Sequence, residues 1–344
     1  MLARKDMLSD ELKGLHSLAI IGMQKNAGKT TVLNRILEEA RRGGDFPRPL
    51  AITSIGRDGE EKDVVTSTVK PKIYIERGTL VATASSFLSR CKLTKEILAS
   101  TQVRTALGEV VLFRALSDGF VEIAGPSSVE GVRRIKEAFL AIDPDCFYLV
   151  DGAISRKSTA GHFLTEGAIL CTGASLDSSM GVVVKKTAAM VEQFLLPGAP
   201  TSVIDVFSKT EAKAAICRSG ELVEIEGDLA FTMASDIAQK WTEDSEALLL
   251  RGVITESFFK NLLQKVSLKG VQVVIEDATR LFVSEGYLDR LKRQEIILEV
   301  FQPIELRAVC LNPFSPRGVD FQAQAFLEEM RQALPVPVYD VRRM

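Results

Sequence analysis

The sequence has few of the residues from which histidine or cysteine sites are built. Its 344 residues include two histidines, His16 and His162, so a histidine-based triad or a multi-histidine metal centre is nearly excluded by supply. The cysteines stand singly, with no C-x-x-C pair, which argues against a disulfide framework and against a zinc site. We therefore expect them to act as small hydrophobic residues. They are Cys91, Cys146, Cys171, Cys217 and Cys310.

Long apolar runs and a strong net charge are also missing. No run approaches the ~20 apolar residues needed to span a bilayer, and the formal net charge is −2. The mixed charges of residues 1–6 are followed by no signal-peptide core. We therefore expect a cytoplasmic protein that binds neither nucleic acid nor membrane. The 46% hydrophobic and 26% charged residues are typical of a globular chain of one large domain or two ordinary ones.

Strand and helix patterns alternate from the start. The apolar run 18–21 predicts a buried strand, residues 30–40 have helical spacing that ends at Gly43-Gly44, and 50–53 predicts a second strand. This order predicts an α/β fold, a mostly parallel sheet with helices on both faces. The region 64–125 holds short β-rich segments. We expect 110–113 and 120–123 to form a hairpin, as an antiparallel extension or edge of the sheet.

The alternation continues to the end of the chain. We expect helices at 128–142, 178–195, 255–265, 285–293 and 320–333, and a hairpin over 213–228 around Ser219-Gly220. Expected strands are 146–151, 168–172, 202–206, 247–251, 271–275, 306–311 and 337–340. We assign 1–200 to a nucleotide-binding domain with the β-rich insertion, and 201–344 to a further α/β region, with a boundary near 197–200. The sequence leaves open whether that region is a separate domain or continues the same sheet.

The segment 22–31, GMQKNAGKTT, carries the groups that a polyphosphate requires. Gly28 lets the backbone approach closely because it has no Cβ. Lys29 supplies a positive charge, Thr30 a hydroxyl for Mg²⁺, and the start of the next helix its dipole. We expect ATP (or GTP) with Mg²⁺ to bind here. The expected binding residues are Gly22, Gln24, Lys25, Asn26, Ala27, Gly28, Lys29, Thr30 and Thr31.

The spacing of this loop departs from the usual G-x-x-x-x-G-K-[ST] pattern. Gly22 and Gly28 stand one position further apart, so Met23 holds the formal first place and Gly22 ends the strand. The wider loop resembles those of dethiobiotin synthetase and the cobyrinate amidases, which belong to the SIMIBI class of P-loop NTPases. The resemblance implies a P-loop NTPase fold.

Acidic residues that could complete the site follow two predicted strands. A P-loop site needs a carboxylate near Mg²⁺, usually at the end of a buried strand. Asp151 fits that demand, and we expect it to bind the metal and act in catalysis with Lys29; a strand-terminal turn is the alternative. In the segment 53–63, Asp58 is our candidate for a catalytic role, either in the second coordination sphere of Mg²⁺ or in positioning water, and Arg57 for a phosphate contact. An exposed charged loop explains that segment equally well.

Two further segments gave weaker candidates. Asn312, after the strand 306–311, could contact a purine edge, although a plain Pro-rich turn explains the segment NPFSPRG as well. Lys157 and Ser158 are either switch-loop residues or merely exposed.

Several segments together resemble a narrower family. They are 22–31, 53–60, 150–153 and 172–174, with Asn312-Pro313 and 338–341. The combination, spread along nearly the whole length, resembles the smaller subunit of the lysine 5,6-aminomutase reactivase. The resemblance implies that the protein works with a MutS-like ATPase to exchange damaged cobalamin in that adenosylcobalamin-dependent enzyme. No D-x-H-x-x-G motif is present, so we expect it to act on a cobalamin enzyme rather than to hold cobalamin.

Two other functions stay open. A small-molecule ligase or kinase of the dethiobiotin-synthetase type would use 64–125 and the C-terminal half as an acceptor pocket. A nucleotide-binding scaffold would never hydrolyse, since no distinct catalytic base is visible and SIMIBI proteins often need a partner subunit. The sequence gives neither the preferred base, nor the partner, nor whether the protein is an oligomer.

Overall fold

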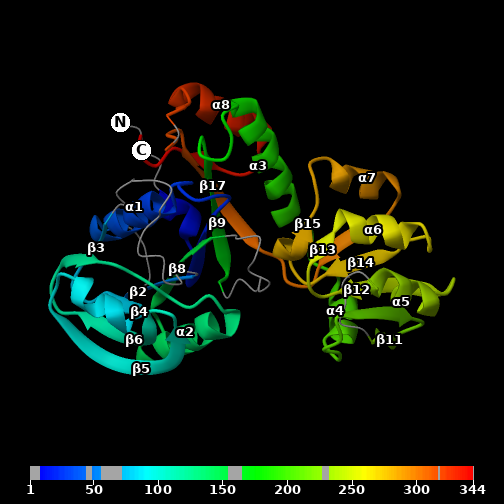
Figure 1. Cartoon of the computed structure of the whole chain (residues 1–344), viewed down its shortest axis with the longest axis horizontal. Coiled ribbons are helices and arrows are strands. Elements are labelled where there is room, and N and C mark those ends of the chain that lie inside the picture. The colour runs from blue at the N-terminus through cyan, green and yellow to red at the C-terminus, as the bar shows by residue number, and fades with distance from the viewer. Residues whose placement is uncertain are drawn as a thin grey trace. The chain divides into compact units, whose positions relative to one another are not determined.

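The computed structural model describes residues 8–43, 49–55, 72–153, 165–226, 232–316 and 318–343. The chain divides into two compact units. Unit 1 consists of Met1–Val184 and Glu305–Met344, and unit 2 of Lys185–Ile304. In Figure 1, unit 1 consists of the blue-to-green first part of the chain and the orange-to-red last part, which begins with β17. Unit 2 consists of the green-to-orange segments between them in sequence.

The described strands of unit 1 form one large mixed sheet in the order β18-β17-β9-β1-β8-β2-β4-β6-β5. Neighbours from β18 to β4 are parallel, whereas β6 is antiparallel to both β4 and β5. The strands are β1 (Ser17–Gly22), β2 (Leu50–Ser54), β4 (Leu80–Ala84), β5 (Lys95–Thr105), β6 (Gly108–Ala115), β8 (Phe147–Ala153), β9 (Gly167–Gly173), β17 (Glu305–Asn312) and β18 (Val338–Tyr339). A separate short pair joins β3 (Ile73–Ile75) to β7 (Gly119–Val121).

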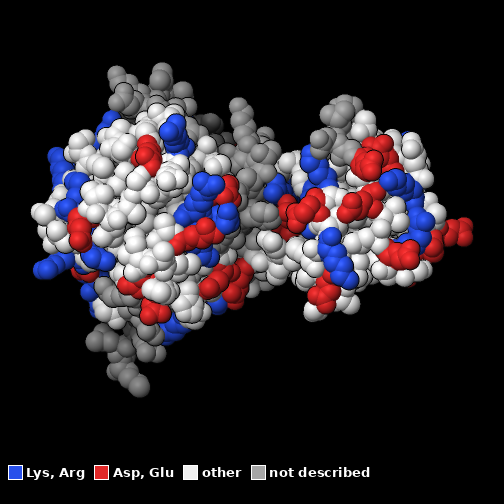
Figure 2. All heavy atoms as spheres, turned by 90° about the horizontal axis from the view of Figure 1, so that it is seen from below, with Lys and Arg blue, Asp and Glu red and all other residues white. Residues whose placement is uncertain are grey.

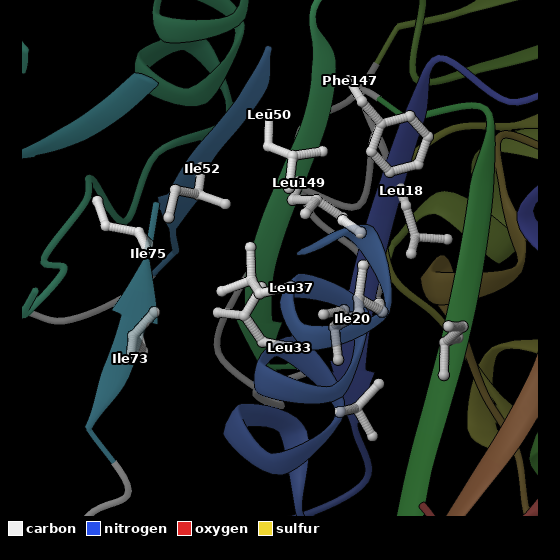
Figure 3. Packing of buried hydrophobic residues seen from close by; sticks show 14 of the residues in the cluster. Leu18, Ile20, Leu33, Leu37, Leu50, Ile52, Ile73, Ile75, Phe147 and Leu149 are labelled. Atoms are coloured by element: carbon white, nitrogen blue, oxygen red, sulfur yellow. The ribbon is translucent and has the colours of Figure 1, made fainter. Parts of the chain in front are cut away.

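Helices cover both faces of this sheet because successive strand side chains point to opposite sides. Phe147 and Leu149 of β8 share a core cluster with Leu33 of α1 (Lys29–Arg41). Tyr148, between them, packs instead with Phe139 of α2 (Val129–Ile142). Figure 3 shows the α1 side, with β1, β8 and β3 contributing to one cluster. The predicted α/β fold with a mostly parallel sheet and helices on both faces is confirmed. The other helical segments of unit 1 are η1 (Leu8–Leu12), η2 (Ser85–Arg90), α8 (Ala323–Ala333) and the first residues of α3 (Met180–Phe194).

Unit 2 has a smaller sheet of its own, in the order β11-β10-β12-β14-β16. The strands β12, β14 and β16 are parallel, and β10 is antiparallel to both of its neighbours. The strands are β10 (Ala214–Arg218), β11 (Glu221–Ile225), β12 (Ser245–Leu250), β14 (Gln272–Ile275) and β16 (Ile297–Val300), with a short pair β13 (Ile254–Thr255) and β15 (Leu281–Phe282). The helices are α4 (Thr201–Phe207), α5 (Met233–Lys240), α6 (Glu256–Leu263), η3 (Ala278–Arg280) and α7 (Tyr287–Arg293).

The division into units differs from the predicted one. The predicted boundary at 197–200 lies inside unit 2, and the region 201–344 does not stay together. Residues up to Ile304 belong to unit 2, whereas β17 returns to unit 1 and pairs with β9. The sequence could not show this, because an apolar run identifies a buried strand but not the sheet that it joins.

Two predicted elements are wrong. The expected strand 202–206 is the helix α4, in which the backbone N–H groups of Val203 and Ile204 both donate to the Pro200 carbonyl. A short apolar run suits a strand or a buried helix equally, and here the preceding proline starts a helix. The expected hairpin of 110–113 with 120–123 is also absent, because β6 pairs with β5 and β4, and β7 with β3. The antiparallel extension itself is confirmed.

Other expectations are confirmed. The hairpin over 213–228 joins β10 to β11, with positive φ angles of 48° at Ser219 and 79° at Gly220, as a tight two-residue turn needs. All five cysteines are free thiols in buried positions. In the part of the chain that the structure describes, no helix has both the length and the apolar character to cross a membrane.

Candidate functional site

The residues 23–28, here called the glycine loop, connect β1 to α1 at the carboxyl edge of the large sheet. Every residue of β1 is buried, so the strand holds the start of the loop firmly. The Met23 N–H extends the pairing by donating to the Cys171 carbonyl on β9, with an N···O distance of 3.0 Å. Asn26 and Gly28 have left-handed φ angles of 63° and 96°. These two positions turn the chain back into α1.

Gly28 is the residue from which α1 starts. Its carbonyl accepts hydrogen bonds from the N–H groups of Thr31 and Val32, at 3.0 and 3.1 Å. No side chain caps this end of α1, so the first N–H groups of the helix have no capping partner from position 28. Such an end attracts an anion, because the exposed N–H groups and the helix dipole both favour negative charge.

The side chain of Lys29 lies back over the end of β1. A Cβ added to Gly22 would come within 2.9 Å of the Lys29 Nζ and 3.0 Å of its Cδ. The absence of a side chain at position 22 therefore makes the space that the lysine occupies. This contact explains why position 22 is a glycine, although the residue ends the strand and does not open the loop.

Asp151 stands on the strand next to β1. The register of the parallel pair places it opposite Ile20, near the carboxyl end of β8, and it is half-buried. Burial is the main cause that raises the pKa of the Cys171 thiol to about 12; the Lys29 charge lowers it and the Asp151 charge raises it. Since both charges act on this one thiol, the lysine and the carboxylate that the sequence predicted lie near the same point of the sheet.

Asn312 holds the glycine loop in place from the end of β17. Its Nδ2 donates to the Asn26 carbonyl at 2.8 Å, and its Oδ1 accepts the Phe314 N–H at 3.3 Å. Its Cβ would lie 3.2 Å from a Cβ on Gly28. These bonds use one N–H and one acceptor position of the amide, and contact with a purine edge stays a prediction. The side chain braces the loop.

A hollow of about 250 Å³ lies beside this brace. It is lined by the segment after β9 and the segment after β17, which are joined where the Ala174 N–H donates to the Asn312 carbonyl at 3.0 Å. The sequence did not predict the hollow, because its walls meet only when β17 pairs with β9. The lining residues are Ala174, Leu176, Asp177, Ser178, Ser315 and Val319.

The predicted binding residues of segment 22–31 lie together along the loop and the first turn of α1. Gly22 and Ala27 are buried, Lys25 and Asn26 are exposed, and Gln24, Gly28, Lys29, Thr30 and Thr31 are half-buried. Four candidates lie outside the described residues: Arg57, Asp58, Lys157 and Ser158. The structure therefore brings together one of the two predicted carboxylates with the predicted lysine and hydroxyls.

Charge is mixed on the face of the molecule that Figure 2 presents. Lysine and arginine side chains alternate there with aspartate and glutamate, and no extended area of one sign is visible. The positive charge of this site is local: Lys29 lies over Gly22 at the start of α1, which no side chain caps, and Lys25 belongs to the glycine loop itself.

A triphosphate with Mg²⁺ fits the groups present. Backbone N–H groups and the Lys29 ammonium suit phosphate oxygens, and the Thr30 hydroxyl and the Asp151 carboxylate are oxygen ligands of the kind that Mg²⁺ prefers. Ligands of open α/β sheets commonly bind at this carboxyl edge. Comparisons with family models, curated proteins and solved structures found no match to this chain.

Proposed function

We propose that the protein is a P-loop NTPase that binds ATP (or GTP) with Mg²⁺ at the glycine loop. The observation that carries this proposal is the position of Lys29, folded over the side-chain-free Gly22 at the start of α1. A flexible, strongly hydrated cation that lies half-buried against a strand end suits a site that receives phosphate.

Each residue then has a defined task. The N–H groups of the loop and of the first turn of α1 donate to phosphate oxygens. Lys29 neutralises charge at the terminal phosphates, and Thr30 and Asp151 would hold Mg²⁺, directly or through water. The ion, when bound, neutralises charge that develops on the transferred phosphoryl group. Asn312 keeps the loop in the shape that these contacts need.

The wider role follows from the resemblance of the sequence. We infer that nucleotide hydrolysis serves to reactivate an adenosylcobalamin-dependent lysine 5,6-aminomutase, in company with a MutS-like ATPase. The resemblance to SIMIBI proteins, which often need a partner subunit to complete the site, supports this role.

Hydrolysis measured in two contexts tests this proposal. ATP turnover is measured for the full chain and for Lys29→Ala, each alone and with an aminomutase holding inactivated cofactor and its MutS-like partner. Lys13→Ala is the control, since Lys13 is an exposed lysine paired with Asp10. After the turnover of the partners without this chain is subtracted, we expect the unchanged protein and Lys13→Ala to show turnover that rises with the partners. Lys29→Ala should show none. Equal turnover in Lys29→Ala and the unchanged protein would refute it.

The same assay separates the other functions. A phosphorylated small molecule formed without any protein partner would identify a ligase or kinase of the dethiobiotin-synthetase type. Tight nucleotide binding without turnover in any combination would identify a scaffold.

A further inference from the structure

A second pocket lies at the other end of α1, away from the glycine loop. It has a volume of about 600 Å³, which is within the range of small-molecule sites. Its walls are the last two turns of α1, the start of β2, the strand β3 with the turn after it, and Phe120 of β7. All of these elements belong to unit 1.

Three cations line this pocket, and two of them rest on aromatic rings. The Arg41 guanidinium carbon is 5.6 Å from the centre of the Tyr74 ring, and the Lys72 ammonium is 5.8 Å from the centre of the Phe120 ring. The rings meet edge to face with centres 5.2 Å apart. Both distances are within the reach of cation–π attraction, so the rings hold the cations in defined positions. Arg77 is the third cation of the lining.

The charge of the walls is unbalanced toward the positive side. Two carboxylates, Glu38 and Glu76, also belong to the lining. Glu38 is already paired with Arg42, which is not a lining residue, at 2.5 Å. Within the described residues, neither Arg41 nor Arg77 nor Lys72 forms an ion pair. The three cations of the lining therefore outnumber its two carboxylates, one of which is paired with an arginine outside the lining.

The backbone around the cations is fixed before any ligand arrives. The Asn34 side chain of α1 donates to the Lys72 carbonyl at 2.9 Å, and the Arg77 N–H donates to Asp118 at 2.8 Å. Between them, Ile73 and Ile75 of β3 are buried in the core cluster of α1, as Figure 3 shows. A site that is ordered in advance loses less freedom when it binds a ligand.

We propose that this pocket binds a small organic polyanion, either a phosphate ester or a polycarboxylate. Both have the multiple oxygens that guanidinium and ammonium groups recognise, and both fit the volume. The proposal does not depend on nucleotide binding, because none of its residues belongs to the glycine loop.

Calorimetric titration of the full chain with fructose 1,6-bisphosphate and with citrate tests the site. All proteins carry Lys29→Ala, so that the glycine loop does not hold the phosphate groups. We expect at least one probe to bind, and the one that binds tells a phosphate ester from a polycarboxylate. Arg41→Ala with Lys72→Ala should weaken binding by about tenfold or more, the loss of at least one charge-assisted contact.

The matched control is Arg134→Ala with Lys13→Ala, which removes two exposed cations whose ion-pair partners also lie outside the pocket lining. It should leave the affinity unchanged, and thermal unfolding verifies that both double variants remain folded. Binding of neither probe would overturn the proposal, as would equal weakening in the two pairs. Binding of a hexaglutamate peptide but of neither probe would also overturn it, and would indicate an acidic protein segment instead.

Discussion

Lys29 occupies the space that a side chain at position 22 would need. Gly22→Ala should therefore displace the lysine while sparing the fold, since the nearest atoms belong to a flexible side chain. We expect nucleotide affinity to fall by about tenfold or more, the value of a charge-assisted contact. Calorimetry measures the affinity. Gly181→Ala adds the same methyl group in open space on α3 and should change nothing. An unchanged affinity in Gly22→Ala would show that the lysine does not act from this position.

Asp151 is the carboxylate that we assign to the metal. Asp151→Asn keeps the shape but removes the charge, so the gain in nucleotide affinity on adding Mg²⁺ should shrink by about tenfold. The affinity without Mg²⁺ should fall little or even rise, because a negative charge near phosphate is gone. Asp145→Asn, an exposed aspartate before the same strand, is the control. If adding Mg²⁺ raises the nucleotide affinity of Asp151→Asn as much as that of Asp145→Asn and of the unchanged protein, Asp151 does not bind the metal and is a turn residue.

The buried carboxyl group of Glu299, in unit 2, leads us to predict that the stability of the folded protein depends on pH. Its side chain is 9% exposed, and its Oε2 has no hydrogen-bond partner among the described residues. Burial raises the pKa of this carboxyl in the folded protein. The unfolded chain thus loses the proton first as the pH rises, and the folded state loses stability over that range. It regains this stability when the pH falls below the ordinary glutamate pKa.

Glu299→Gln removes that loss, because the amide does not ionise. The difference in melting temperature, variant minus unchanged protein, should therefore be larger near neutral pH than at acid pH. Thermal unfolding at both pH values measures the difference. Glu295→Gln, at a glutamate that is 64% exposed, should show a smaller dependence. A difference that is the same at both pH values would contradict the role of burial.

At the scale of elements, β17 supports the glycine loop through Asn312. If this residue is a brace, Asn312→Ala should weaken inorganic triphosphate and ATP by similar factors, because both need the same loop shape. The lost hydrogen bond is worth about 1 kcal/mol, or roughly fivefold in affinity. If Asn312 reads the base, ATP binding weakens but triphosphate binding does not. Competition titrations with the two ligands tell these results apart.

The elements that carry the site could be predicted because local signals agree there. An apolar run, a glycine loop and helical spacing all indicate the same order, and β1, α1 and β8 appear where expected. The helix α4 was missed because its few apolar residues suit a strand as well. The contact between Asn312 and the glycine loop was not predicted, because 286 positions separate Asn312 from Asn26 in the sequence. The two residues come together only because β17 pairs with β9.

At the scale of the whole molecule, the chain leaves unit 1 after Val184, forms unit 2 with a sheet of its own, and returns to the large sheet of unit 1 at β17. The segment 185–304 forms a unit between two parts of unit 1. Sequence patterns predicted most of its strands and helices but not its limits, because a domain boundary depends on which strands pair. Everything assigned to the glycine loop, including Asn312, lies in unit 1.

Nucleotide binding to the whole chain tests the central claim most directly. Calorimetry with Mg–ATP and Mg–GTP is performed on the unchanged protein, on Lys29→Ala and on the control Lys13→Ala. We predict saturable binding of at least one nucleotide, retained in the control and weakened by about tenfold to a hundredfold in Lys29→Ala. Absence of binding to the folded protein, or equal affinity in Lys29→Ala, would contradict the account.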